Sequence, residues 1–313
     1  MTHENPDRVK TQLLDAYLLE NEEIGTSSLV GAKCLGFYPT LLHSTGDLLF
    51  GEVLTSGVNK LMNDQHCRVM EAKRIIDLGM GIGKFCLQLF IQFPHLQHIL
   101  GIELVPSRVH LAISAVDRWI SATPATEQSS FFVERSPTRL LLHLTPTIPV
   151  TPLLSATSTM TTPPPIISIS TTGKEKSCSK RKKCGEDGNF HQKRHKRRVI
   201  QEERKEKDNQ EGRFLDYRCG DLFEICPEEL ARADIVICQT AFLRSSYNRL
   251  CTFLDHLKTG TRLVTYHDIA TIYREQNRTF KFEKLTINQS MENRFFTTWA
   301  PQKGHHFHIW TRL

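Results

Sequence analysis

The sequence lacks the features that mark secreted, membrane and metal-stabilised proteins. It has no uninterrupted apolar run near the roughly 18 residues of a membrane-spanning helix. Residues 1–6 lack the apolar core of a signal peptide. The nine cysteines are odd in number and scattered, with no C-x-x-C pair, so neither a disulfide framework nor a zinc site is indicated. We therefore expect a soluble intracellular protein, without contact with a membrane.

Positive charge is present but gathers in one place. The 313 residues carry a net charge of +6. Between positions 180 and 198, nine Lys or Arg and two acids give a local charge of +7, which leaves −1 for the other 294 residues. The folded part is therefore expected to be near neutral. The basic segment comprises Lys180, Arg181, Lys182, Lys183, Lys193, Arg194, Lys196, Arg197 and Arg198.

The composition around the basic segment does not favour a packed core. Thr, Pro and Ser dominate residues 145–170, and the basic residues follow. Such a stretch buries too little apolar surface to offset the entropy lost when the chain is ordered. The sequence thus predicts a disordered insertion at 145–211. The other expected parts are a small helical N-terminal lobe at 1–46 and a core in two pieces, 47–144 and 212–313.

The most informative pattern is an apolar strand at 74–78, a glycine-rich turn at 79–83 and a helix at 84–93. A second apolar strand at 99–103 ends in an acid. Parallel strands joined by helices predict a doubly wound, Rossmann-like α/β sheet, for which we expect seven strands. Other expected strands are 213–222, 233–239, 261–266, 281–287 and 304–310, and other expected helices are 5–23, 47–62, 106–122 and 246–257. Residues 131–142 are either a hairpin or part of a crossover.

The glycines and two acids indicate an adenosine-containing cofactor. Glycine lets such a ligand approach the backbone at the carboxyl end of the first strand. Gly79, Gly81 and Gly83 alternate, whereas a pyrophosphate binder prefers its third glycine one position later. Asp77 suits the ammonium and sulfonium end of S-adenosylmethionine, and Glu103 can accept hydrogen bonds from both ribose hydroxyls. We expect this cofactor; the alternative is a glycine-rich turn without a ligand.

The order of these and other motifs resembles the non-SET histone lysine methyltransferases of the disruptor-of-telomeric-silencing family. The resemblance covers residues 47–122 and 213–311, and the short chain is most similar to the compact kinetoplastid members. The shared motifs are at 50–52, 77–83, 101–103, 220–222, 238–242, 258–264 and 298–299. The resemblance implies a class I methyltransferase fold and a nuclear, monomeric enzyme. It would transfer a methyl group from S-adenosylmethionine to a lysine on the globular surface of histone H3 in nucleosomes.

The resemblance also implies which residues form the site. Asp221 would accept a hydrogen bond from the adenine amine, and Gln239 and Trp299 would line the channel of the substrate lysine, with no general base assigned. The whole expected cofactor-binding set is Glu52, Val53, Asp77, Gly79, Gly81, Gly83, Lys84, Glu103, Asp221, Leu222 and Gln239.

Three places depart from the family pattern. Residues 238–240 are Cys-Gln-Thr where the family usually has Asn-Asn-Phe, His306 stands in place of a tyrosine, and Lys84 in place of a glutamine. These departures leave open how many methyl groups are transferred, and the sequence does not identify the lysine.

Other functions stay open. A methyltransferase for RNA or another protein could also use the basic segment, and the altered 238–240 would suit an inactive chromatin-binding module. A dehydrogenase fits the glycine spacing less well. The basic segment itself fits a nuclear import signal, contact with nucleosomal DNA, both, or a solvated loop. His305, His306 and His308 alternate without a fourth ligand, so we expect a strand there and no metal site.

Overall fold

The computed structural model describes residues 4–19, 52–124, 130–136, 138–145, 212–285, 294–298 and 300–313. Residues 1–145 and 212–313 form one compact unit, and 146–211 are a second unit. The basic segment and, apart from Thr145, the predicted insertion lie outside the described residues. Within the described ranges, no helix combines the length and the apolar character needed to cross a membrane.

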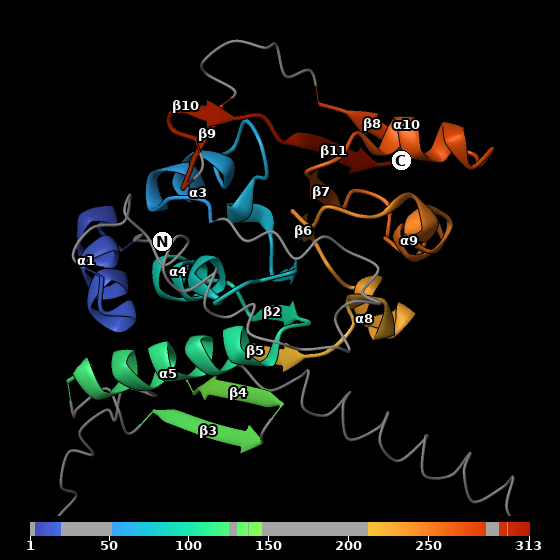
Figure 1. Cartoon of the computed structure of the whole chain (residues 1–313). Coiled ribbons are helices and arrows are strands. Elements are labelled where there is room, and N and C mark those ends of the chain that lie inside the picture. Colours follow the sequence, from blue (N-terminus) through green and yellow to red (C-terminus); the bar gives the residue numbers. More distant parts are fainter. Residues whose placement is uncertain are drawn as a thin grey trace, which may run out of the picture. The chain divides into compact units, whose positions relative to one another are not determined.

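The centre of the unit is a nine-stranded, mostly parallel sheet with the order β3-β4-β5-β2-β1-β6-β7-β11-β8 (Figure 1). A separate two-stranded sheet pairs β9 (Phe295–Thr297) with β10 (Ala300–His305). The strands of the large sheet are β1 (Arg74–Leu78), β2 (His98–Glu103), β3 (Phe131–Ser136), β4 (Arg139–Leu144), β5 (Arg213–Cys219), β6 (Ile235–Cys238), β7 (Arg262–Thr265), β8 (Phe282–Lys284) and β11 (His308–Arg312).

Seven of these strands form the predicted doubly wound core. β1 lies between β2 and β6 in parallel, β5 continues the sheet beyond β2, and β7 continues it beyond β6. β11 runs antiparallel between β7 and β8. The order from β5 to β8 is that of class I methyltransferases. The predicted count of seven is wrong for the whole sheet, because the β3–β4 hairpin adds two antiparallel strands beyond β5.

Helices cover both faces of the sheet. On one face lie α1 (Pro6–Tyr17), α3 (Thr55–Leu61), α4 (Lys84–Gln92) and α5 (Pro106–Ala122), and on the other lie α8 (Pro227–Leu230), α9 (Tyr247–Leu254) and α10 (Ile269–Glu275) (Figure 1). Three short 3-10 helices complete the described elements, η3 (Val69–Glu71), η4 (Leu222–Glu224) and η5 (Arg244–Ser246).

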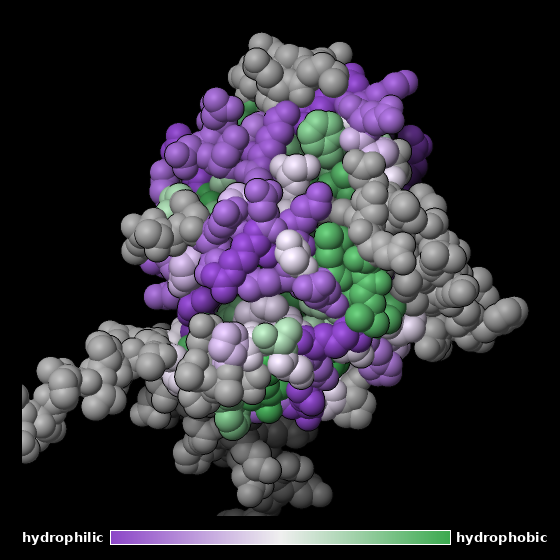
Figure 2. Space-filling view, turned by 90° about the vertical axis from the view of Figure 1, so that its left-hand side faces the viewer, coloured by the Kyte–Doolittle hydropathy of each residue, from purple (hydrophilic) through white to green (hydrophobic). Residues whose placement is uncertain are grey.

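Successive strand residues enter the two cores in turn. Ile75 of β1 and Ile99 of β2 belong to the core under α4 and α5, whereas Ile76 and Leu100 belong to the core under α9 and α10. This alternation follows from the two-residue repeat of a strand. Because both faces are covered, the central strands β1, β2 and β6 are buried at nearly every position. Figure 2 shows the outer side of the α1 and α3 face, where hydrophilic residues cover much of the described surface, as expected of helices whose apolar side faces a sheet.

The first helix begins as predicted but ends earlier. The N–H of Asp7 donates to Asn5 Oδ1 at 2.9 Å, which caps the helix. The helix stops at Tyr17, not at 23, because Leu18 adopts a left-handed conformation with φ 55°. The side chain of Leu18 is largely exposed, with 73% of its surface accessible.

Other element ends also differ from the expectations. The helix expected at 47–62 begins at Thr55, and 47–51 lie outside the described residues. Of the helix expected at 246–257, only α9 forms. Of the strand expected at 281–287, β8 forms, and residues 286–287 lie outside the described ranges. The strand expected at 304–310 is interrupted at 306–307, which separate the end of β10 from the start of β11. The hairpin alternative at 131–142 is the one that forms.

Candidate functional site

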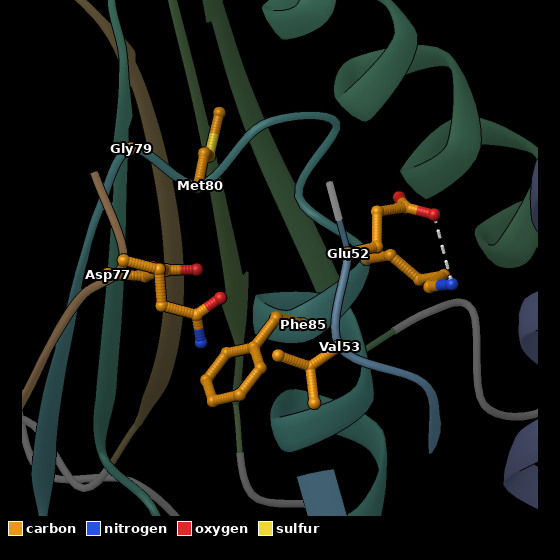
Figure 3. A pocket seen from close by; sticks show the side chains of 8 residues that line it. Glu52, Val53, Asp77, Gly79, Met80 and Phe85 are labelled. Carbon is orange, nitrogen blue, oxygen red and sulfur yellow. Dashed lines mark hydrogen bonds and ion pairs between the residues drawn. The ribbon is translucent and has the colours of Figure 1, made fainter. Parts of the chain in front are cut away.

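A pocket lies at the carboxyl end of β1, where the glycine turn begins (Figure 3). Because β1 and β6 are parallel neighbours, their carboxyl ends meet at this edge of the sheet. The cavity is partly open to solvent and has a volume of about 30 Å³, so a ligand much larger than a water molecule requires it to widen. The lining residues are Glu52, Val53, Asp77, Gly79, Met80, Lys84, Phe85 and Gln239.

The turn after β1 has a backbone that favours glycine at three positions. Gly79, Gly81 and Gly83 have φ values of 85°, 58° and 74°, in the left-handed region that L-residues with side chains rarely adopt. There is also no room for a side chain at Gly79 or at Gly83. A Cβ on Gly79 would lie 2.4 Å from Thr240 Oγ1, and one on Gly83 would lie 2.8 Å from Tyr217 Cζ. The predicted close-approach turn is therefore present.

Glu103, at the end of β2, holds this turn through its side chain. Its Oε2 accepts a hydrogen bond from Gly81 N–H and its Oε1 one from Val105 N–H, both at 2.9 Å. Arg108 Nη1 lies 3.6 Å from Oε1. Burial raises the pKa of Glu103, although Arg108 and the backbone donors oppose the shift. A carboxylate has about four acceptor positions, so ribose hydroxyls could still bind, but Glu103 does not line the described pocket.

Asp77 is a buried acid in the wall of the pocket. It is 5% exposed, and Cys86 Sγ donates to its Oδ2 at 3.5 Å. Burial raises the pKa of Asp77 to about 7; the Cys86 hydrogen bond lowers it and the charge of Glu103 raises it. Among the described residues, no cation forms an ion pair with it. Because an ionised buried carboxylate is costly without a cation, this side of the pocket favours a cationic ligand.

An ion pair forms the opposite side of the pocket. Lys84 Nζ lies 3.1 Å from Glu52 Oε2, and both side chains are buried, 4% and 7% exposed. Figure 3 shows this pair across the pocket from Asp77, with Phe85 and Val53 between them. The ammonium of Lys84, paired with Glu52, therefore forms part of the pocket wall.

The backbone of Glu52 is joined to the small β9–β10 sheet. Its N–H donates to Thr298 Oγ1 at 3.1 Å, and Thr298 N–H donates to the Glu52 carbonyl at 2.9 Å. Val53 forms a bridge with Thr297. Trp299, the expected wall of the lysine channel, follows directly in the chain but lies outside the described residues.

The residues after β6 place an amide at the pocket. Gln239 is partly exposed and lines the pocket, and its place at the mouth of a substrate channel stays a prediction. Next to it, Thr240 Oγ1 donates to the Leu78 carbonyl at 3.0 Å, which ties this segment to the end of β1. Cys238 is buried, and burial raises the pKa of its thiol to about 12, so it stays protonated at neutral pH.

Asp221 and Leu222 lie outside the pocket lining. Asp221 caps η4 by accepting from Phe223 N–H at 3.0 Å, and it forms an ion pair with Arg249 at 2.9 Å. The guanidinium of Arg249 in turn lies 4.5 Å from the centre of the Phe223 ring. Leu222 packs at the edge of the core under α9. Contact of these two residues with adenine stays a prediction.

Sequence reasoning did not identify several residues of the site. Met80 and Phe85 line the pocket. Met80 lies within the 77–83 motif and Phe85 two residues after it, so their positions in the sequence could have pointed to them. Tyr17 and Tyr217 hydrogen bond to the turn. Nothing local distinguishes these two tyrosines from other core aromatics.

The histidines near the C-terminus lie on two strands. His305 of β10 stacks on Tyr266, with ring centres 5.1 Å apart, and His308 of β11 stacks on Trp310. Arg294 Nε donates to His306 Nε2 at 3.2 Å. Within the described ranges, no group of three or more His, Cys, Asp or Glu is placed to hold a metal ion.

The strand order and the glycine turn between two strand-end acids define a doubly wound α/β protein with the class I methyltransferase topology. No protein-family model and no curated protein matches the sequence. Solved structures do match, among them a crystal structure of a "putative O-methyltransferase" from Klebsiella pneumoniae. It is 9% identical, with a TM-score of 0.39, and the match covers 97% of this chain and 96% of that chain. So weak a likeness adds no argument, and the fold assignment rests on the strand order.

Proposed function

We propose that this protein is an S-adenosylmethionine-dependent methyltransferase. The observation that carries the proposal is Asp77, a buried carboxylate without a cationic partner among the described residues. It lies where the glycine turn leaves β1, in a sheet with the class I methyltransferase order. A ligand with a positive charge and a need for close backbone approach fits both features.

The charges of the pocket fit this cofactor. With Glu52, Asp77 and Lys84 ionised, the lining carries one more negative than positive charge. The ammonium, carboxylate and sulfonium of S-adenosylmethionine together carry one more positive than negative charge. The two sets therefore neutralise one another, which limits the cost of burying them. When bound, the cofactor supplies an electrophilic methyl group.

We further propose a lysine on histone H3 in nucleosomes as the substrate. The motif order from 50–52 to 298–299 supports it, together with Gln239 at the pocket. The substrate amine must be neutral, and loss of its proton costs about 4–5 kcal/mol at pH 7 from a pKa near 10.4. A dry channel beside a sulfonium lowers that pKa, and alignment supplies much of the remaining rate. No residue is assigned as a general base.

The basic segment would then serve nuclear import, contact with nucleosomal DNA, or both. RNA or another protein as substrate, and an inactive chromatin-binding module, are the competing functions. The Cys-Gln-Thr sequence at 238–240 favours the last of these.

The test is to incubate the full chain with labelled S-adenosylmethionine and, separately, nucleosomes, free histones and RNA. We expect transfer to nucleosomes, and mass spectrometry of the product would give the lysine and the number of methyl groups. Gly81→Arg, which fills the turn, should be inactive. Asp117→Asn, on the exposed side of α5, should be as active as wild type.

Preference for RNA would overturn the histone proposal but keep the methyltransferase. Equal, negligible turnover of wild type and Gly81→Arg on every substrate would support the inactive module instead.

A further inference from the structure

Two buried phenols donate hydrogen bonds to consecutive carbonyls of the glycine turn. Tyr17 Oη donates to the Ile82 carbonyl, and Tyr217 Oη donates to the Gly83 carbonyl, each at 2.8 Å. Tyr17 is the last residue of α1 and is 7% exposed; Tyr217 lies in β5 and is fully buried. Two elements far apart in the chain thus meet at the turn.

Both phenols stay donors at neutral pH. Burial raises the pKa of Tyr17 and of Tyr217 well above that of a free tyrosine, and neighbouring acidic groups such as Glu52 and Cys86 raise the pKa of Tyr17 further. Each hydroxyl therefore keeps its proton. The bonds to the turn do not depend on pH in the range where enzymes of this class are assayed.

The Ile82 and Gly83 carbonyls lie in the chain between two residues that shape the site. The preceding residue, Gly81, donates to Glu103, and the following residue, Lys84, carries the ammonium that lines the pocket. Rotation of the peptide at Ile82 or Gly83 would move both. Glycine lowers the energetic cost of such rotations, so contacts from outside the turn are needed to hold it in the observed conformation.

The helix that carries Tyr17 is held in place without the help of its hydroxyl. Val9 and Leu13 are buried against the core, 0% and 2% exposed. Arg118 Nε donates to the Ala16 carbonyl at 2.5 Å, next to Tyr17. Removal of the hydroxyl alone should therefore leave α1 packed on α4 and α5.

We propose that Tyr17 is a positioning residue for the cofactor, acting through the Ile82 carbonyl, with Tyr217 acting in the same way through Gly83. The inference rests on the proposed function. It makes α1, which the sequence places in a lobe of its own, part of the cofactor-binding site.

The test compares three full-length variants, Tyr17→Phe, Tyr217→Phe and the control Tyr273→Phe. Tyr273 is a fully buried tyrosine of α10 whose Oη lies 3.0 Å from the Cys251 carbonyl and 3.0 Å from Asp255 Oδ1, in the other core. The measurements are the Kd of S-adenosylmethionine by calorimetry, the KM and kcat on nucleosomes, and the melting temperature.

We expect Tyr17→Phe and Tyr217→Phe to raise the Kd and KM of the cofactor about three- to tenfold, the effect of one lost hydrogen bond. The kcat should change less than about twofold. The control should lower the melting temperature to a similar degree without changing the Kd, which separates positioning from general stability.

Wild-type affinity in Tyr17→Phe, or equally weakened binding in the control, would overturn this inference alone. If the wild-type chain does not bind the cofactor, the proposed function fails and this inference fails with it.

Discussion

Glu103 and Gly81 are joined by a hydrogen bond of 2.9 Å from the glycine N–H to the carboxylate. The acid at the end of β2 therefore shapes the turn that follows β1, in addition to any contact with a ribose. Substitution of Glu103 would disturb the turn and the ligand together. The side chain of Asp77 accepts a hydrogen bond only from a thiol among the described residues. Its substitution therefore tests the effect of the negative charge on binding without removing a hydrogen bond to the turn.

Cofactor affinity should depend on the ionisation of Asp77. Burial raises the pKa of this side chain to about 7, so below that pH it is mostly neutral and attracts a cation weakly. The affinity should fall up to about tenfold for each pH unit below 7 and level off above it. Calorimetry from about pH 5.5 to 8.5 measures this. In Asp77→Asn, binding should be weak and independent of pH, and a flat profile in wild type would contradict the assignment.

The free energy of unfolding should also depend on the ionisation of Asp77, but with the opposite dependence on pH. The pKa of Asp77 is higher in the folded state than the ordinary value of 3.8, so the folded state binds more protons between about pH 4 and 7. The free energy of unfolding should therefore decrease as the pH rises through that range, then become constant. Asp77→Asn should be more stable than wild type at about pH 8 in urea unfolding, and a less stable variant would show that the carboxylate is stabilised by a partner.

Close packing at the turn can be tested by substitution of Gly83, with Gly220 as the control position. Gly83 has φ 74° and a Cβ there would lie 2.8 Å from Tyr217, whereas a Cβ on Gly220 would meet nothing within 4 Å. Gly83→Ala should lower the free energy of unfolding by about 1–3 kcal/mol through strain and overpacking. Gly220→Ala should stay within about 0.5 kcal/mol of wild type. Equal effects in urea unfolding would argue against the turn geometry.

The end of α1 allows a stabilising substitution. Leu18 has φ 55° and is 73% exposed, so its side chain adds backbone strain without much packing. Leu18→Gly should raise the free energy of unfolding by about 0.5–1 kcal/mol. Leu18→Ala keeps a Cβ in the left-handed conformation and should show no such gain. Thermal and urea unfolding of both variants decide the point.

The insertion should be removable without loss of the core. Leu144 and Arg213 face one another in the antiparallel β4–β5 pair, so an Asn-Gly turn in place of 145–212 can join the two strands. Cofactor affinity should be unchanged, since loop length has a small effect on stability. Nucleosome binding should weaken and lose part of its salt dependence if the basic segment contacts DNA.

The control keeps the length of the insertion and replaces its nine basic residues with Gln. It should lose as much of the salt dependence as the shortened chain does. An unchanged salt slope in both variants would exclude the DNA contact.

Much of the fold could be predicted because its signals are local. The apolar runs of β1, β2 and β6 and the glycines after β1 lie within short windows, and they gave the doubly wound core and the position of the turn. The end of α1 could not be predicted, because Leu18 continues an apolar pattern yet adopts a left-handed conformation. The β3–β4 hairpin could be predicted only as one of two alternatives, because a short apolar run does not show which segment it pairs with.

For the site, the sequence by itself determined the chemistry of one strand end. An acid and three alternating glycines within seven residues require a turn with positive φ beside a carboxylate, wherever the rest of the chain lies. Only the tertiary structure decided what surrounds Asp77. Glu52 pairs with Lys84 from 32 residues away, and the phenols of Tyr17 and Tyr217 reach the turn from 65 and 134 residues away. Thr240, next to Gln239, bonds to the end of β1 from 162 residues away. Contacts over such separations are set by how the sheet and helices pack, which local patterns do not encode.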